Sequence, residues 1–466
     1  MKLFGDGFRE ECGVCAVVGH PDAANLVYLG LYALQHRGQE SAGIAVWDGQ
    51  GIYAHRAMGY VADIFDRDIL SRLSGAIAIG HVRYSTAGDS TLANAQPLLV
   101  NTHFGPLAVA HNGNLVNAPR LRKELEEQGA IFQSSSDTEV IFHLVARGQG
   151  VSVADAILAA LGIVQGAFSL VMLAKDQVIV ARDPLGFRPL VLGKMDGAWV
   201  VASETCAFDL LGATVLREVE PGEVLLLSPQ GWQQLKPASP PPYAHCIFEH
   251  VYFARPDSRV FGEDVGVVRQ RMGERLALEQ PANADVVVGV PDSGIPAALG
   301  YARVSGLPFV IGMVRNHYVG RTFIEPKQSI RHFGVKVKLN PVRSAVAGKR
   351  VVLVDDSIVR GTTSRKIVIM LKQAGAREVH LRISSPPTIG SCFYGIDTPE
   401  RRELIAANAT IEEIRAFVGA ESLGYLSVDG MLTCLQSPHR NFCTACFSGR
   451  YPMVPGEEPA LVRAER

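Results

Sequence analysis

The chain alternates short apolar runs with polar, glycine-containing turns, a pattern typical of a protein with both strands and helices. Residues 351–354 are four consecutive apolar side chains, which favours a strand buried on both faces. The run ends abruptly at Asp355 and Asp356, and Gly361-Thr362-Thr363 follow. We therefore expect a strand that reaches the surface at the acidic pair, and then a helix from Ser364 to Gln373.

A second strand, loop and helix follow the same pattern earlier in the chain. Residues 285–290 are mostly apolar and end in a turn at Asp292-Ser293-Gly294, and an amphipathic helix is expected before them, around Val265 to Leu278. In open α/β sheets ligands bind where parallel strands end, and a helix N-terminus attracts phosphate. The two loops therefore predict a site for an anionic ligand. The alternative at Asp355 and Asp356 is an acidic pair that only caps a helix.

The amino-terminal half places polar groups in Gly- or Ser-rich turns beside apolar runs. Alternating small and apolar residues predict a strand from Cys12 to Gly19. Four further stretches carry such polar turns: Tyr32–Gly43, Gly80–Thr86, His111–Leu115 and Ser135–Glu139. This arrangement is expected of binding loops on a rigid sheet. A single cysteine in a strand is ordinarily a buried structural residue, but these loops give Cys12 candidate partners.

Two stretches bear on a membrane and on the division into domains. The uncharged run Ala156–Ala174 is long enough to raise the question of a membrane span. Gly162 and Gln165-Gly166 divide this run into a helical half and a β half, so we interpret it as buried core. The segment Pro237–Pro242 cannot continue a helix or a central strand, and it predicts a domain boundary.

Composition limits the classes of partner. The 466 residues give room for two or three domains. Lys and Arg number 45 against 46 Asp and Glu, so no overall field attracts nucleic acid or an anionic membrane, and any phosphate must be bound locally. No secretory signal is visible, and the eight cysteines then predict a reducing compartment, the cytoplasm, where thiols act as nucleophiles or metal ligands.

The stretch from Val351 to Thr363 resembles the motif of type I phosphoribosyltransferases that binds phosphoribosyl diphosphate (PRPP). The resemblance implies a C-terminal domain with a mainly parallel sheet. It also implies that the acidic pair holds the ribose near Mg²⁺, that the next loop binds the 5′-phosphate, and that the earlier turn takes the diphosphate. The implied PRPP-binding residues are Asp292, Ser293, Gly294, Asp355, Asp356, Ser357, Arg360, Gly361, Thr362 and Thr363, with Ser293, Asp355 and Asp356 facing the magnesium ion.

The turns of the amino-terminal half resemble those of the glutamine amidotransferases of the N-terminal-nucleophile type. This resemblance implies a four-layer αββα glutaminase domain, in which residues 1–11 are a propeptide and Cys12 is the nucleophile. A thiol must be deprotonated to attack a carboxamide, and an α-amine freed at Cys12 is a nearby base of suitable strength. Cys15 is the rival nucleophile, although it has the pattern of a core residue.

The same resemblance assigns four further glutaminase residues. Asn112, through its side chain, and Gly113, through its backbone N–H, are expected to stabilise the tetrahedral oxyanion. Arg83 is expected to pair with the glutamine α-carboxylate and Asp137 with its α-ammonium. Such a pair would select free glutamine over a protein side chain.

Four cysteines of the C-terminal half are candidate metal ligands. The pair Cys443 and Cys446 alone suits zinc, redox chemistry or a cluster, and Cys246 and Cys392 would complete four thiolates. Thiolate count does not separate zinc from an iron–sulfur cluster, and free thiols are a third alternative. The segments around Cys392 and Cys443 resemble those of the iron–sulfur branch of the glutamine PRPP amidotransferases. This implies a 4Fe-4S cluster, for which Cys434 could replace one ligand.

Both halves together resemble, in order, the glutamine PRPP amidotransferases. The implied organisation is a propeptide (1–11), a glutaminase domain (12–236), a phosphoribosyltransferase domain (243–452) and a flexible tail (453–466). The implied reaction is amidation of PRPP with ammonia from glutamine, the first committed step of purine synthesis. The family further implies purine nucleotides as feedback inhibitors and a homotetramer. The basic segment Arg321–Asn340 is expected to be a flap over PRPP, or else a solvated face.

Two other functions fit part of the pattern. Sister amidotransferases join the Cys12 half to a sugar isomerase or an ATP-dependent synthetase domain, which the motif at Asp355 and Asp356 opposes. A regulator that senses PRPP without turning it over would have no use for a glutaminase. Cys12, Arg83 and their partners in the amino-terminal half therefore oppose the second alternative.

Overall fold

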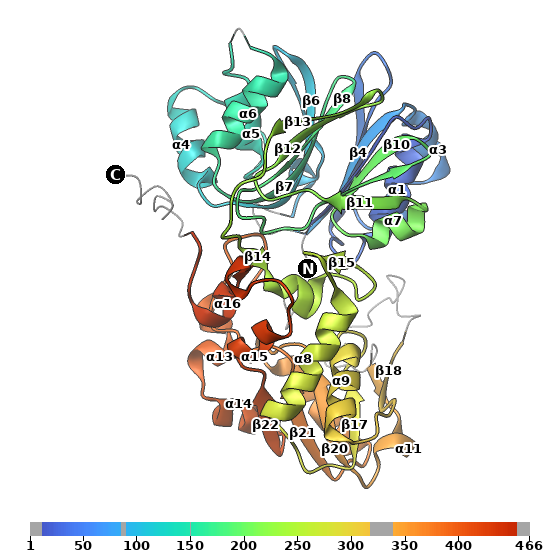
Figure 1. Ribbon diagram of the computed structural model, residues 1–466, viewed down its shortest axis with the longest axis vertical. Coiled ribbons are helices and arrows are strands. Elements are labelled where there is room, and N and C mark those ends of the chain that lie inside the picture. Colours follow the sequence, from blue (N-terminus) through green and yellow to red (C-terminus); the bar gives the residue numbers. More distant parts are fainter. Residues whose placement is uncertain (1–11, 85–89, 150, 317–338, 454–466) are drawn as a thin grey trace, which may run out of the picture.

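The computed structural model describes residues 12–84, 90–149, 151–316 and 339–453, which form two domains stacked one above the other (Figure 1). The predicted propeptide 1–11, residues 321–338 of the predicted flap and the tail beyond residue 453 lie outside these ranges. The N-terminal domain is the upper one in the view and the C-terminal domain the lower one.

The N-terminal domain is built on two antiparallel sheets. The first has the order β11-β9-β10-β1-β4-β2-β3, with β1 (Gly13–Val18), β2 (Ser41–Trp47), β3 (Ile52–Met58), β4 (Ile77–Arg83), β9 (Val191–Met195), β10 (Ala198–Ala202) and β11 (Thr214–Glu218). The second has the order β13-β12-β8-β7-β6-β5, with β5 (Leu98–Thr102), β6 (Gly105–Leu115), β7 (Gly166–Ala174), β8 (Gln177–Arg182), β12 (Val224–Ser228) and β13 (Gly231–Lys236).

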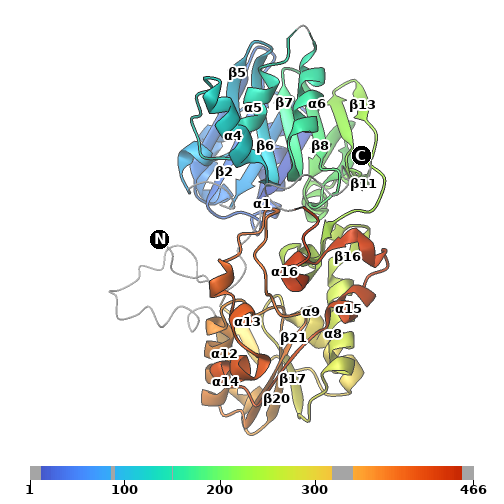
Figure 2. The same ribbon diagram turned by 90° about the vertical axis from the view of Figure 1, so that its left-hand side faces the viewer.

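Helices cover the outer face of each sheet, so the domain has the predicted four layers, which are seen edge-on in Figure 1. Figure 2 views the same layers from one outer helical face. The first sheet is covered by α1 (Ala23–Ala33), α2 (Val61–Ile64), α3 (Arg67–Arg72) and α7 (Cys206–Leu211), and the second by α4 (Ala118–Glu127), α5 (Glu139–Val145) and α6 (Val153–Ile163). Strand β1 is buried on both faces: Val14 and Ala16 pack against the second sheet, while Cys15 and Val17 face the helices. This is the alternation of a β-strand.

The C-terminal domain has a parallel sheet in the order β17-β20-β21-β22, formed by β17 (Val286–Gly289), β20 (Arg350–Asp355), β21 (Glu378–Ile383) and β22 (Ser422–Tyr425). Helices α8 (Val265–Glu279) and α9 (Ile295–Ser305) pack on one face, and α12 (Thr362–Gln373) and α14 (Ile411–Val418) on the other. The shorter elements are β14 (His245–Cys246), β15 (Arg259–Val260), β16 (Glu263–Asp264), β18 (Met313–Arg315), β19 (Leu339–Pro341), β23 (Phe442–Cys443), α11 (Arg343–Val346), α13 (Ile405–Asn408), α15 (Val428–Thr433) and α16 (Ala445–Ser448).

Most of the predicted elements are confirmed, but two stretches expected as polar turns are wrong: residues 80–83 belong to β4 and residues 111–115 belong to β6. The run Ala156–Ala174 divides into helix α6 and strand β7, and none of the helices in the described part of the chain has the length and apolar character that a membrane span needs. The helix predicted to begin at Ser364 begins at Thr362 instead, so that expectation was wrong by two residues. Gly361 adopts a φ of 78°, a left-handed conformation that turns the chain directly into the helix.

The ends of β17 and β20 form a topological switch point. Phe309 pairs in parallel with Val287 on the side of β17 that faces away from β20. The chain therefore leaves β17 through α9 over one face of the sheet, and leaves β20 through α12 over the other. Ligands of open α/β sheets bind in the crevice that such diverging connections leave at the carboxyl ends of the strands.

Buried ion pairs join the two domains. Glu249, which belongs to the C-terminal domain, accepts hydrogen bonds from Arg37 of the N-terminal domain at 2.7 and 2.9 Å. Its carboxylate also lies 3.5 Å from the guanidinium of Arg188, and all three side chains have no solvent exposure. A buried carboxylate shared by two buried guanidinium groups is stable only while all members are present.

We expect Glu249→Ala to lower the free energy of unfolding by about 3–5 kcal/mol, because it removes the buried carboxylate that the Arg37 and Arg188 guanidinium groups share. The measurement is the shift of the urea unfolding midpoint. Glu412→Ala is the control, since Glu412 pairs with Arg415 on the surface and is 74% exposed, and it should change the free energy by less than about 1 kcal/mol. Equal shifts for the two variants would contradict the importance of the buried pair.

Candidate functional site

Cys12 directly precedes β1, the strand of the first sheet that pairs with β4. It is 6% exposed, and its thiol donates to the backbone carbonyl of Tyr84 at 3.4 Å. Because Gly13 is in register with Val82, the cysteine is adjacent to the end of β4, which carries the predicted glutamine-binding Arg83. Arg83 is 3% exposed and lies 3.7 Å from the carboxylate of Glu40.

Two buried histidines connect this cysteine to the second sheet. The His81 ring on β4 hydrogen-bonds the carbonyl of His111 on β6 at 2.9 Å, which fixes Asn112 next to it. The His111 ring in turn contacts the Thr138 hydroxyl at 3.0 Å, next to Asp137. These hydrogen bonds link the stretches that carry Arg83, Asn112 and Asp137 to one another. Burial lowers the pKa of His81 to about 3, so the His81 ring stays uncharged near neutral pH.

Asn112 and Gly113 have the properties expected of an oxyanion site. The Asn112 side chain is 1% exposed, yet neither its amide nitrogen nor its amide oxygen has a hydrogen-bond partner among the described residues. Buried polar atoms are nearly always paired, so an unpaired amide beside a candidate nucleophile fits a site for a ligand. Gly113 has a φ of 146°, and a Cβ there would lie 2.0 Å from the carbonyl oxygen of Ala167, so only glycine fits.

The Asp137 carboxylate can accept further hydrogen bonds although it already accepts two. One carboxylate oxygen accepts from the Leu115 N–H at 2.8 Å and the other from the Thr138 hydroxyl at 3.2 Å. A carboxylate has about four acceptor positions, so capacity remains for an ammonium group.

The charged residues behind Cys12 were not predicted from the sequence. Arg37 donates through Nε to the Cys12 carbonyl at 3.1 Å and through Nη1 to Glu204. Burial opposes ionisation of Glu204, but His36 and Arg37 outweigh it and hold its pKa well below the usual range. Arg37 lies in the predicted polar turn Tyr32–Gly43, so a buried arginine in that turn was the available signal.

The predicted PRPP loops meet at the switch point. The N–H of Val290 donates to the carbonyl of Val354 at 2.9 Å, and a Cβ on Gly294 would lie 2.5 Å from the same oxygen. The turn after β17 therefore packs directly against the end of β20, as the resemblance implies. Asp355 and Asp356 are 7% and 6% exposed at that end.

The acidic pair is arranged to receive positive charge. Burial and the neighbouring Asp356 raise the pKa of Asp355. Burial likewise raises the pKa of Asp356, although hydrogen bonds from Ser293 and Ser357 oppose the rise. Two adjacent buried carboxylates are costly unless a cation or a ligand hydroxyl compensates them, so the donor set of Ser293, Asp355 and Asp356 fits Mg²⁺.

Two other predicted PRPP residues have partners on the surface. The Asp292 carboxylate is 2.8 Å from Arg315, and the Arg360 guanidinium is 2.8 Å from Glu403. Gly361, Thr362 and Thr363 form the N-terminal end of α12, where backbone N–H groups lack partners within the helix. This end of the helix suits a phosphate.

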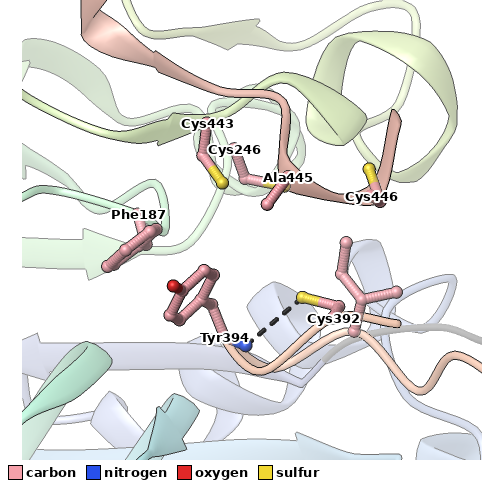
Figure 3. A pocket seen from close by; sticks show the side chains of 8 residues that line it. Phe187, Cys246, Cys392, Tyr394, Cys443, Ala445 and Cys446 are labelled. Carbon is pink, nitrogen blue, oxygen red and sulfur yellow. Dashed lines mark hydrogen bonds between the residues drawn. The ribbon is translucent and has the colours of Figure 1, made fainter. Parts of the chain in front are cut away.

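The four predicted cysteine ligands line one pocket at the domain boundary (Figure 3). Strands β14 and β23 pair in parallel and place Cys246 opposite Cys443. Cys446 follows in α16, and Cys392 approaches from another segment, together with aromatic walls from Phe187 and Tyr394. Cys434 does not line this pocket. Its thiol instead donates to the Gly430 carbonyl at 3.2 Å.

The donor chemistry of the pocket fits a thiolate-bound metal centre. Burial raises the pKa of Cys443 to about 12, and burial together with the other three cysteines raises the pKa of Cys446 well above its usual range. Free thiols would stay protonated there, whereas a bound metal deprotonates its thiol ligands. Among the described residues, no group of three or more His, Cys, Asp or Glu side chains is already close enough to coordinate an ion.

Comparison with known proteins agrees with this division. A family described as "Glutamine amidotransferase domain" matches residues 81–209, and one described as "Phosphoribosyl transferase domain" matches residues 270–385. The chloroplastic amidophosphoribosyltransferase of Glycine max is 54% identical over 96% of this chain and 79% of its own length. The amidophosphoribosyltransferase of Bacillus subtilis is 51% identical over 96% of this chain and 95% of its own length.

Two solved structures have the same fold over the whole chain. One is described as the allosteric regulatory enzyme of purine biosynthesis, with a TM-score of 0.91, 49% identity and coverage of 97% of this chain and 98% of the other. The second is the Bacillus subtilis glutamine PRPP amidotransferase complexed with ADP and GMP, with a TM-score of 0.90, 49% identity and coverage of 97% and 100%. This chain therefore belongs to the amidophosphoribosyltransferases, the enzymes of purine biosynthesis that use glutamine to amidate PRPP.

Proposed function

We propose that Cys12 hydrolyses glutamine and that the released ammonia attacks PRPP held by the loops after β17 and β20. The observation that carries the glutaminase assignment is the Asn112 amide, which is buried beside the Cys12 cluster and unpaired among the described residues. The cluster of Cys12, Arg83 and Asp137 around it supplies the other groups that the reaction needs.

Glutamine hydrolysis begins with attack of the Cys12 thiolate on the side-chain carboxamide of glutamine. Removal of residues 1–11 would free the α-amine of Cys12, which takes the thiol proton and returns it to the leaving nitrogen. The Asn112 amide and the Gly113 N–H donate to the oxyanion of the tetrahedral intermediate. Ammonia leaves, and water then cleaves the thioester to release glutamate.

Selection of free glutamine falls to two charged side chains. The Arg83 guanidinium binds the α-carboxylate of the substrate, and Asp137 accepts from its α-ammonium. Both side chains are anchored before the substrate arrives, Arg83 near Glu40 and Asp137 by the Leu115 N–H. Little ordering is then required when glutamine binds.

In the second domain, the lone pair of ammonia attacks C1 of the ribose with inversion, and diphosphate leaves. Asp355 and Asp356 bind the ribose hydroxyls, the N-terminal end of α12 binds the 5′-phosphate, and the turn at Ser293 and Gly294 binds the diphosphate. Mg²⁺ on Ser293, Asp355 and Asp356 would supply positive charge for the leaving diphosphate. Ammonia in water is mostly protonated and unreactive, so it must cross between the domains without reaching bulk solvent.

The finer properties of the family are proposed in the same way. Cys246, Cys392, Cys443 and Cys446 hold a 4Fe-4S cluster, whose role is to tie three segments of the domain boundary together. Purine nucleotides inhibit the enzyme, in keeping with the ADP and GMP bound to the Bacillus subtilis protein. The enzyme acts as a homotetramer in the cytoplasm, although plant relatives are chloroplastic.

Cys12→Ala should abolish glutamine-dependent formation of 5-phosphoribosylamine, while activity with added ammonia stays within about twofold, because only the nucleophile is lost. Cys15→Ala is the control. Cys15 is fully buried and burial raises its pKa to about 12, so its replacement should leave glutamine-dependent activity in place. Equal loss of both activities in Cys12→Ala would count against two separate sites.

Asp356→Asn should weaken PRPP binding in the presence of Mg²⁺ by at least about tenfold, because it removes one of the negative charges that hold the cation. Isothermal titration of the variant with PRPP and Mg²⁺ measures this change. Asp285→Asn is the control, since Asp285 lies at the opposite end of β17 and pairs with Arg350. The same affinity in the two variants would refute the assignment.

Protein prepared without oxygen should be coloured and contain iron and sulfide in equal amounts. Cys443→Ser should lose most of the iron, whereas Cys434→Ser should keep it, because Cys434 lies outside the cysteine pocket. Visible absorption and elemental analysis distinguish the outcomes. A colourless protein that contains zinc would show that the four cysteines hold zinc and not a cluster.

A further inference from the structure

A short segment of the C-terminal domain, Phe393–Gly395, packs against the oxyanion strand of the glutaminase domain. A Cβ on Gly395 would lie 3.0 Å from both the Cα and the carbonyl carbon of Gly113, so the two backbones are in direct contact. On its other side, Gly113 is equally confined, because a Cβ there would lie 2.0 Å from the Ala167 oxygen on β7. Strand β6 is therefore enclosed at Gly113 between its own sheet and the other domain.

Three side chains of the glutaminase domain hold the 393–395 segment in place. Asn114, the residue after Gly113, donates through Nδ2 to the Phe393 carbonyl at 2.8 Å. Arg188 donates through Nε and Nη2 to the Tyr394 carbonyl at 2.9 and 2.7 Å. The ring of Phe187 stacks on that of Tyr394 with centroids 4.2 Å apart and an interplanar angle of 19° (Figure 3).

The contacts of Arg188 and Tyr394 are buried, and the Asn114 hydrogen bond is partly buried. Arg188 has no solvent exposure and also lies 3.5 Å from Glu249, the carboxylate that binds Arg37. Tyr394 is 2% exposed. The carbonyls of Phe393 and Tyr394 thus accept hydrogen bonds from the glutaminase domain. The segment is therefore bound to that domain and does not merely lie beside it.

Oxyanion stabilisation depends steeply on such support. Donors must be held within about 0.5 Å of their productive positions, and a misplacement of about 1 Å can cost about 100-fold in rate. Gly113 can provide its N–H at the right place only if its backbone cannot move away from the substrate. The contact with Gly395 prevents the Gly113 backbone from moving toward the 393–395 segment.

We infer that Phe393–Gly395 is a positioning element of the glutaminase, which holds the oxyanion site from the phosphoribosyltransferase side through Asn114 and Arg188. The inference rests on the proposed roles of Asn112 and Gly113 and adds to them a requirement for the other domain. The segment begins directly after Cys392, and the Tyr394 N–H donates to the Cys392 sulfur at 3.2 Å. The cysteine pocket and the oxyanion site therefore share one short piece of chain.

The first test compares Asn114→Ala with Asn117→Ala in the full-length protein. Asn117 also makes side-chain hydrogen bonds, to Ile163 and Gln165, but both are inside its own domain. Asn114→Ala should lower kcat for glutamine hydrolysis about tenfold and leave KM for glutamine within about twofold, since substrate binding by Arg83 and Asp137 is untouched. Asn117→Ala should leave kcat within about twofold. No difference in kcat between the two variants would overturn the inference.

The second test uses Gly395→Ala, whose added Cβ would lie 3.0 Å from two backbone atoms of Gly113, so that Gly113 must shift slightly. Because Gly395 has a φ of 105°, the control is Gly49→Ala, at a φ of 100° with no atom within 4 Å of the added Cβ. Gly395→Ala should lower kcat for glutamine hydrolysis about tenfold, while ammonia-dependent activity with PRPP shows that the C-terminal domain is still folded. Normal glutaminase kcat in Gly395→Ala would overturn the inference.

Asn112→Ala separates failure of this inference from failure of the proposed function. Loss of one oxyanion donor should cost about 10²–10³ in kcat. If Asn112→Ala keeps its kcat, the oxyanion assignment itself is wrong. If Asn112→Ala loses kcat while Asn114→Ala and Gly395→Ala match their controls, only the positioning role is wrong.

Discussion

The arrangement of the two domains depends on the buried ion pairs that the Glu249 carboxylate forms with Arg37 and Arg188. This carboxylate lies without solvent exposure between Arg37 and Arg188, which belong to the other domain. Arg37 reaches from this carboxylate to the backbone of Cys12, and Arg188 reaches from it to Tyr394. A buried charge cannot be left without its partners, so the domains have one favourable relative position, and the glutaminase centre is complete only in that position.

Each half of the enzyme uses its sheet differently. The glutaminase domain places its reactive groups where strands of two facing sheets end, and His81 fastens one sheet to the other. The phosphoribosyltransferase domain instead uses the opening that the diverging connections of β17 and β20 leave. On the proposed function, the first arrangement binds free glutamine. The second binds PRPP through backbone N–H groups and two carboxylates.

Local pattern was enough to predict the strands that carry the chemistry. The apolar run before Asp355 and the alternation after Cys12 each formed the expected strand, and the division of Ala156–Ala174 into helix and strand was correct. The candidate residues of the amino-terminal half could be named only through the resemblance to the glutamine amidotransferases, and Arg83, Asn112 and Gly113 lie in strands rather than in the expected turns. The start of α12 was placed two residues late, since the left-handed Gly361 is a property of backbone conformation and not of periodicity.

Contacts between distant segments could not be predicted. Nothing near Glu249 in the sequence indicates that it meets Arg37, 212 positions away, because buried ion pairs leave no periodic signal. The same holds for Gly395 and Gly113, whose closeness depends on the docking of one domain on the other. One consequence concerns the evolution of the chain. A glutaminase domain joined to a different synthetic domain would lack the loop that contacts its strand at Gly113, so the new partner would have to supply a replacement for that loop.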